Sequence, residues 1–130
     1  MRFLAVMLMG CVCVAGCQPV PPRTDHGEII QRNGGYKVLK KEAAEIFKTI
    51  DLTKTETVDP VHYTPQIRAL KPQIVAAHEV EPPVLMIQTM GGFNHQGLLI
   101  VLDTSSTHRP TIGHNWVRTE LAPGVFEFRE

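Results

Sequence analysis

Val84-Leu85-Met86-Ile87-Gln88-Thr89-Met90 and Leu98-Leu99-Ile100-Val101-Leu102 are two nearly continuous apolar runs in the second half of the chain. Runs of this length, rich in aliphatic side chains, predict central strands that are covered on both faces or lie deep in a small core. The segment between them, Gly91-Gly92-Phe93-Asn94-His95-Gln96-Gly97, begins and ends with glycine and predicts a hairpin connection with a glycine bulge. These two runs therefore form the centre of the expected sheet.

The sheet is expected to extend from this hairpin in both directions along the chain. Residues 74–79 form a shorter apolar run that predicts a strand before the hairpin. After it, residues 116–121 and 125–129 predict a second hairpin at the end of the sequence. The pair Pro123-Gly124 between them suits the centre of a type II turn, where glycine supplies the positive φ.

Two helices are expected before the strands. The longer one covers about residues 37–50, and its apolar positions recur at helical spacing while lysine and glutamate occupy the other positions. The shorter one covers about residues 65–70, with Thr64 as N-cap, and ends before Pro72. We therefore expect an α+β fold in which both helices pack on a mainly antiparallel sheet of about four to five strands.

The N-terminal segment has the features of an export signal. Met1-Arg2 supplies a positive charge, and the apolar run Phe3–Val14 that follows is too short to cross a bilayer core, which takes about 20 helical residues. The run leads into Val14-Ala15-Gly16-Cys17, which resembles the lipobox of bacterial lipoproteins, in which small residues precede an obligatory cysteine. The resemblance implies that residues 1–16 are cleaved and that Cys17 carries acyl chains such as palmitate. An ordinary signal peptide with a chance cysteine is the alternative.

The composition and length of the remaining chain predict how it is organised. Residues 17–35 are polar and rich in proline and glycine, which predicts a lipidated tether in which Ile29 and Ile30 dock on the domain. Residues 36–130 then form a single small domain. Gln18 replaces the aspartate that commonly retains such lipoproteins at the inner membrane. It therefore favours the outer membrane, facing the periplasm, if the organism is Gram-negative.

Charge and cysteine content exclude several classes of function. Without Arg2, one of the 13 basic residues, the chain has one more acidic than basic side chain, so no strong field attracts nucleic acid. Cys11 and Cys13 lie in the leader, and Cys17 is the lipidation site. The mature domain then has no thiol for a disulfide, a thiolate metal site or a nucleophile. No cofactor is expected.

The candidate chemical groups are sparse. His95, His108 and His114 lie in polar segments beside the apolar strands, and imidazoles that converge can hold zinc or copper. Their spacing matches none of the compact ligand signatures, so these histidines are weak candidates. The glycine-rich segment 91–97 lacks the lysine of a phosphate-binding loop. Ser105 and Ser106 lie near His108 in sequence, but proximity along the chain does not make a triad.

Trp116 could stack on a ligand, although a tryptophan at the core or its rim is the simpler interpretation. The chain is thus expected to be a membrane-anchored cell-envelope lipoprotein with a structural or binding role and no catalytic one. Its expected partners are the membrane, through the lipid on Cys17, and an envelope protein that the sequence does not identify. The alternative is a periplasmic metal-binding protein or small hydrolase that uses His95, His108 and His114. A binder that docks a peptide on an exposed sheet edge is a third hypothesis.

Overall fold

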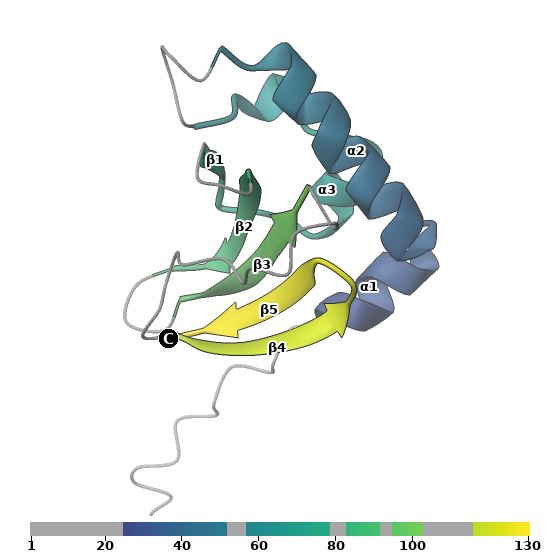
Figure 1. Ribbon diagram of the computed structural model, residues 1–130, viewed down its shortest axis with the longest axis vertical. Helices are drawn as coiled ribbons and strands as arrows, with labels where there is room; N and C mark the ends of the chain where they lie inside the picture. Colours follow the sequence, from purple (N-terminus) through teal and green to yellow (C-terminus); the bar gives the residue numbers. More distant parts are fainter. Residues whose placement is uncertain (1–24, 52–56, 79–82, 92–94, 103–115) are drawn as a thin grey trace, which may run out of the picture.

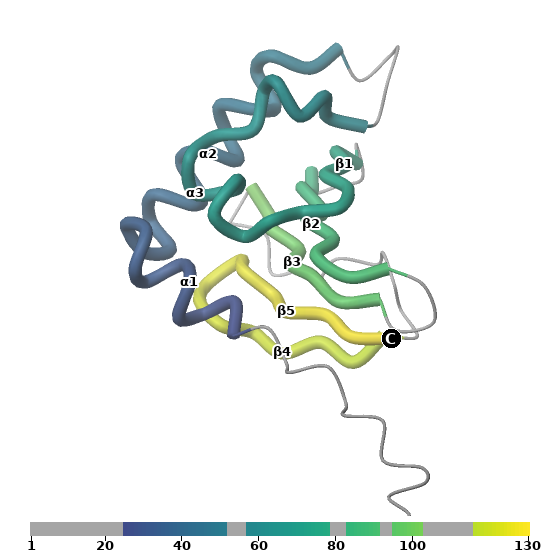
Figure 2. Tube along the Cα trace, turned by 180° about the vertical axis from the view of Figure 1, so that it is seen from behind, coloured from purple at the N-terminus to yellow at the C-terminus, as the bar shows by residue number. Residues whose placement is uncertain are grey.

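A five-stranded antiparallel sheet lies beside a layer of three α-helices in the part of the chain that the structure describes. The structure is a computed structural model and describes residues 25–51, 57–78, 83–91, 95–102 and 116–130. Figures 1 and 2 show that the helices all lie on one side of the sheet. We call the side of the sheet that carries the helices the helix face, and the opposite side the far face. The expected α+β class is confirmed.

The sheet has the strand order β1-β2-β3-β5-β4, and every neighbouring pair is antiparallel. The two apolar runs form the central strands β2 and β3, as predicted, and the last two strands form the predicted C-terminal hairpin. The strands are β1 (Ile74–His78), β2 (Val84–Met90), β3 (Gln96–Val101), β4 (Val117–Ala122) and β5 (Val125–Arg129).

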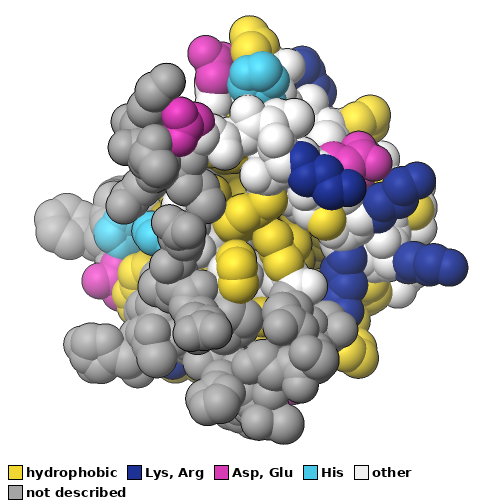
Figure 3. Space-filling view, turned by 45° about the horizontal axis from the view of Figure 1, so that its top comes forward, with side chains coloured by type: hydrophobic (Ala, Val, Ile, Leu, Met, Phe, Trp, Pro, Cys, Tyr) yellow, Lys and Arg dark blue, Asp and Glu magenta, His cyan; other side chains and the backbone are white. Residues whose placement is uncertain are grey.

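The helices are α1 (His26–Arg32), α2 (Gly35–Thr49) and α3 (Pro65–Ala69), and Pro60–His62 adds a 3₁₀ turn, η1. Helix α2 runs along the helix layer from α1 to the side of β1 (Figure 1). Its buried positions, Leu39, Ala43 and Ile46, follow the predicted apolar stripe. Figure 3 shows Lys and Arg side chains gathered on the side of the molecule where α2 lies, which fits a helix whose remaining positions are polar. Both predicted helices are therefore confirmed.

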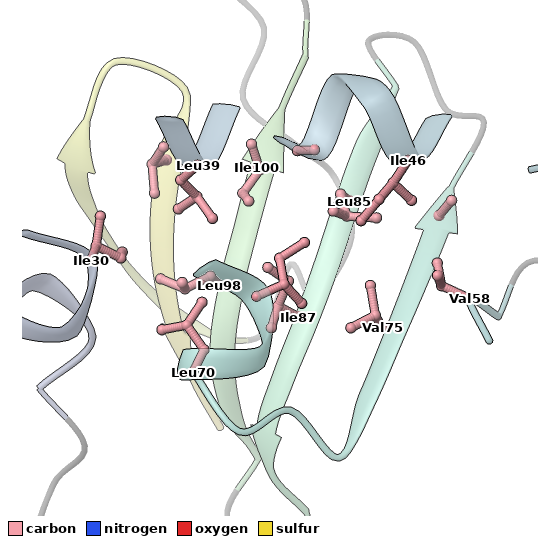
Figure 4. Close-up of a cluster of buried hydrophobic side chains, with 14 residues drawn as sticks. Ile30, Leu39, Ile46, Val58, Leu70, Val75, Leu85, Ile87, Leu98 and Ile100 are labelled. Carbon is pink, nitrogen blue, oxygen red and sulfur yellow. The ribbon is translucent and has the colours of Figure 1, made fainter. Parts of the chain in front are cut away.

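Side chains are buried on both faces of the two central strands. On the helix face, Leu85, Ile87, Leu98 and Ile100 pack under residues from all three helices (Figure 4). On the far face, a second cluster surrounds Phe128. Its buried members are Val84, Leu99, Val101, Phe126 and Phe128, with Met86 and Trp116 packed against them. The lack of alternation in the two apolar runs thus follows from burial on both faces.

Two glycines have backbone roles in this sheet. Gly124 has a φ of 79° in the turn between β4 and β5, which is the conformation predicted for the Pro123-Gly124 pair. Gly97 lies where β2 and β3 approach closely, because a Cβ atom there would lie 2.0 Å from the Ile87 carbonyl oxygen. The register of β2 and β3 shifts between Gln88 and Met90, so the irregularity lies just before the glycine-rich segment.

The tether prediction is wrong for residues 26–35. Residues 26–32 form helix α1, in which His26 and Ile30 are buried, and α2 begins at Gly35. Asp25 starts α1 because its side chain accepts a hydrogen bond from the Glu28 amide at 2.9 Å. Ile30 docks in the core as expected. None of the described helices has both the length and the apolar character that a membrane crossing needs.

Candidate functional site

A buried polar cluster joins α1 to two strands of the sheet. His26, the first residue of α1, is fully buried and uses both ring nitrogens. Its Nδ1 lies 2.8 Å from Oε2 of Glu127 in β5, and its Nε2 lies 2.8 Å from the Thr89 hydroxyl in β2. We call these three residues the His26 cluster. It spans the sheet above β3, because β3 lies between β2 and β5.

The hydrogen bonds of the cluster form a chain. An ionised carboxylate only accepts, so Nδ1 of His26 donates to Glu127. Thr89 has a second partner, since its hydroxyl lies 3.3 Å from the Gln96 carbonyl oxygen. With a neutral ring, Nε2 accepts from Thr89, whereas a charged ring donates and turns the hydroxyl toward Gln96. The cluster therefore satisfies its buried polar atoms in either protonation state.

Charged and phenolic groups surround the outer end of the cluster. Arg129 donates from Nη2 to Oε1 of Glu127 at 2.9 Å, so the two carboxylate oxygens have different partners. Burial, followed by the charges of Asp25 and Glu127, raises the pKa of the Tyr36 phenol above its ordinary value of 10.0. Glu127 thus links a buried imidazole to a guanidinium and a phenol nearer the surface.

Hydroxyl, imidazole and carboxylate follow one another here in the order that serine hydrolases use. The setting is different, however, because His26 is fully buried and Thr89 is only 9 % exposed, so the hydroxyl is enclosed as well. A substrate would have to reach this enclosed hydroxyl before His26 could act as a base. The contacts of His26 are instead those of a clamp that fixes α1 on the helix face.

A pocket lies next to the cluster at the β4 edge of the sheet. It has a volume of about 200 Å³ and is lined by Val117, Thr119, Glu127 and Arg129. Val117 pairs with Arg129 and Thr119 with Glu127, so all four side chains belong to one face of the β4–β5 hairpin. Glu127 also contacts His26 of α1, which identifies this face as the helix face. The pocket can hold a small side chain beside a paired carboxylate and guanidinium.

Two residues brace the three helices against one another. Glu42 of α2 accepts hydrogen bonds from the Thr64 hydroxyl at 2.9 Å and the Gln66 amide at 3.2 Å, and so caps the start of α3. The buried amide group of Gln66 donates to the carbonyls of Ile30 and Gly35 at 3.0 and 3.1 Å. These contacts fix the turn between α1 and α2, and therefore the position of His26.

His95 contacts a different carboxylate at the end of the sheet. Its Nδ1 forms a hydrogen bond with Oε2 of Glu130, and both side chains are partly exposed. The ring centroid of Trp116 lies 6.5 Å from that of His95 and 4.6 Å from that of Phe128, on which it stacks. Trp116 therefore packs at the rim of the far-face cluster, as its simpler interpretation predicts.

Most other predicted site residues lie outside the described part of the chain. This applies to the lipidation site Cys17, to Ser105 and Ser106, and to His108 and His114. The convergence of the three histidines is therefore a prediction that stays open. Among the residues described, no three His, Cys, Asp or Glu side chains are placed so that they could share a metal ion.

The role of His26 does not follow from the tether that was predicted for residues 17–35. A signal was present in the sequence. Asp25 followed by Glu28 is a residue pair typical of a helix N-terminus, and Asp25 does cap α1. Ile29 and Ile30 then supply the apolar residues that such a helix needs.

Comparisons with known proteins add no assignment: no family, no curated protein and no solved structure matches this chain.

Proposed function

We propose that this chain is an exported bacterial lipoprotein, anchored in a cell-envelope membrane by lipid on Cys17, whose domain has a structural or binding role and no catalytic one. The observation that carries this proposal is the sequence Val14-Ala15-Gly16-Cys17 at the end of a charged and apolar leader. Two or more acyl chains on Cys17 would give a stable anchor. Gln18 favours the outer membrane, facing the periplasm, in a Gram-negative organism.

The start of the folded domain limits how far it can lie from the anchor. Asp25 caps α1, and residues 18–24 separate it from Cys17. A fully extended segment of this length spans at most about 28 Å. The proposed lipoprotein therefore holds its domain close to the lipid surface, with α1 as the first described helix after the anchor.

The assignment of a non-catalytic role rests on how the described histidines are used. His26 is enclosed in the core, and its ring joins α1 to β2 and β5. His95 has one carboxylate partner and stands beside Trp116 at the surface. His95 and Trp116 together offer a polar and an aromatic group for binding a partner at the surface.

The anchor is tested by Cys17→Ser, with Cys13→Ser as the matched control in the same leader. The protein is produced in a bacterial host with an alkyne analogue of palmitate, and the labelled fraction and membrane association are measured. Cys17→Ser should lose the label and leave the membrane fraction, because the diacylglycerol is attached through a thioether bond and serine has no sulfur to form it. Cys13→Ser should behave like the parent chain. Equal labelling of Cys17→Ser and the parent would overturn the proposal.

A metal-binding role is the second candidate, favoured by the contact between His95 and Glu130. A histidine and a carboxylate that already lie together could form part of a zinc site with His108 and His114. Native mass spectrometry of the purified protein, with added zinc and with a chelator, tests this candidate. One bound metal ion that His95→Ala abolishes would support metal binding over a purely structural role. Equal masses in zinc and chelator would exclude it.

A further inference from the structure

The two edges of the sheet differ in how they are covered. Beside β1, Thr57 forms an antiparallel bridge with Ala76, and the Val58 amide donates to the Val75 carbonyl at 2.9 Å. Beside β4, none of the described residues forms a strand pairing on the outer side. An open strand edge is a template for pairing with another chain, and natural proteins usually protect it.

The sequence of β4, the strand at this edge, is complementary to itself. In Val117-Arg118-Thr119-Glu120-Leu121, the residues on either side of Thr119 have matching characters: arginine against glutamate, then valine against leucine. When such a strand meets a second copy in antiparallel orientation around Thr119, Arg118 faces Glu120 and Val117 lies opposite Leu121, where the register of β4 with β5 shifts. We propose that β4 is a homodimerisation edge, which pairs with β4 of a second copy around a two-fold axis at Thr119.

The charged pairs of this arrangement lie on the far face. Arg118 of each copy is opposite Glu120 of the other, so the dimer gains two ion pairs between opposite charges. The register within the chain supports the placement, because Arg118 pairs with Phe128 and Glu120 with Phe126, both of which belong to the far-face cluster. A guanidinium has five N–H donors, so Arg118 can bind the second copy's carboxylate while keeping contacts within its own chain.

The apolar pairs lie on the helix face and cover an exposed side chain. Val117 is 70 % exposed. In the dimer, Val117 of each copy faces Leu121 of the other, so the two-fold axis produces this contact twice. Val117 and Thr119 also line the pocket beside Glu127, so the second strand closes the outer side of this pocket in each copy.

The symmetry of the pairing places both helix layers on one side. A two-fold axis that relates two antiparallel neighbouring strands runs perpendicular to the sheet, so each face of one copy continues into the same face of the other. The five-stranded sheet becomes a sheet of twice the width, with α1 of both copies on the same face. On the proposed lipoprotein, both N-terminal segments then leave from the same layer and can reach one membrane. The dimer itself does not require the anchor.

The dimer is expected to be weak in free solution. Pairing of one short strand buries less surface than the ~1,600 Å² of a standard stable interface. Confinement to a membrane raises the effective concentration of the second copy and favours the pair without any new contact. The test is therefore made on the full chain in the membranes of the producing cells.

Single cysteines on β4 test the position of the axis. Thr119→Cys places two thiols directly opposite each other, where Cβ atoms of paired residues lie about 5 Å apart and can form a disulfide. Val117→Cys is the matched control on the same strand and face. Its two thiols lie four residues apart along the paired strands, or about 14 Å. Membranes are oxidised with copper phenanthroline, and dimer formation is measured on non-reducing gels, with the parent chain as the blank.

We expect a strong dimer band from Thr119→Cys and little from Val117→Cys. Random collisions would give at least as much dimer from Val117→Cys, because the Val117 side chain is so strongly exposed. Equal yields at the two positions would overturn the proposal. A Thr119→Cys product whose mass shows a different protein would overturn it as well, and so would a Thr119→Cys variant that stays monomeric under full oxidation.

Charge exchange tests the pairing partner. Glu120→Arg, added to Thr119→Cys, sets arginine against arginine at both ends of the interface and should lower the dimer yield about tenfold. The further change Arg118→Glu restores opposite charges across the axis and should restore the yield. Circular dichroism spectra equal to that of the parent chain show that the variants are folded. A yield that ignores both charge changes would contradict the proposed register.

Discussion

His26 and His95 each contact a carboxylate of the C-terminal strand region, but they do so in different surroundings. His26 is fully buried on the helix face, and Thr89 binds its second nitrogen. His95 lies at the surface, where Glu130 and the ring of Trp116 are its neighbours. A lost hydrogen bond at the surface is replaced by water, whereas one lost in the core leaves a polar atom without a partner. The same pair of residue types should therefore contribute very differently to stability.

The largest effect is expected from His26→Ala. The change removes the partner of Thr89 and of one Glu127 oxygen, and it leaves a cavity under α1. These losses together should lower the free energy of unfolding by about 3 kcal/mol. Urea unfolding of the purified protein, followed by circular dichroism, measures the change. A loss below about 1 kcal/mol would show that α1 is held by its apolar contacts alone.

A smaller effect is expected from Thr89→Val, which keeps the shape of the side chain and removes only the hydroxyl. The Nε2 atom of His26 and the Gln96 carbonyl both lose this partner. A loss of about 1–2 kcal/mol follows from one buried hydrogen-bonding group. The His26→Ala/Thr89→Val double variant sharpens the comparison, because coupled residues should give less than the sum of the two single losses. Full additivity would contradict a shared cluster.

The strands and α2 could be predicted from the sequence because their signals are local. An apolar run of strand length or a helical stripe has its cause in neighbouring residues, as in β2, β3 and α2. The His26 cluster has no such signal, since His26 is 101 residues from Glu127 and 63 residues from Thr89 along the chain. Only the antiparallel order of the sheet, which sets β5 next to β3, brings these side chains under α1.

His95→Ala is the surface counterpart of His26→Ala and should have little effect. Both side chains of the His95–Glu130 pair are partly exposed, and exposed ion pairs contribute at most about 1 kcal/mol. We expect a loss below about 0.5 kcal/mol, since water replaces the lost partner. The same urea experiment measures it. A loss as large as that of His26→Ala would mean that burial does not separate the two pairs.

The smallest effect concerns the ionisation of two tyrosines, Tyr36 beside the His26 cluster and Tyr63, at alkaline pH. Burial and the nearby carboxylates raise the pKa of Tyr36, and burial raises that of Tyr63 despite a backbone hydrogen bond from Val75 that lowers it. The folded protein then holds these protons at pH values where the unfolded chain has released them. The contribution of the two tyrosines to stability is therefore fully present below pH 10, and it is lost as the pH rises through their pKa values in the folded protein.

Absorbance at 295 nm, which reports phenolate, checks this prediction. The two tyrosines of the chain should titrate above pH 10 in the folded protein and near pH 10 in urea. Tyr36→Phe should remove the contribution of Tyr36 to the titration curve. In the chain that keeps Tyr36, Glu127→Gln should lower the pKa of Tyr36, because one nearby negative charge is lost. Identical titration curves in the folded and unfolded states would contradict the proposed charge environment.

The position of His26 at the first turn of α1 has a mechanical consequence. If Cys17 is fixed in a bilayer, a pull on the domain enters the fold at Asp25 and reaches His26 first. The hydrogen bonds of the ring to Thr89 and Glu127 would transmit this force to β2 and β5. Detachment of α1 from the sheet would then break both of these hydrogen bonds. In the proposed lipoprotein, the His26 cluster would therefore lie at the end of the domain that the anchor loads.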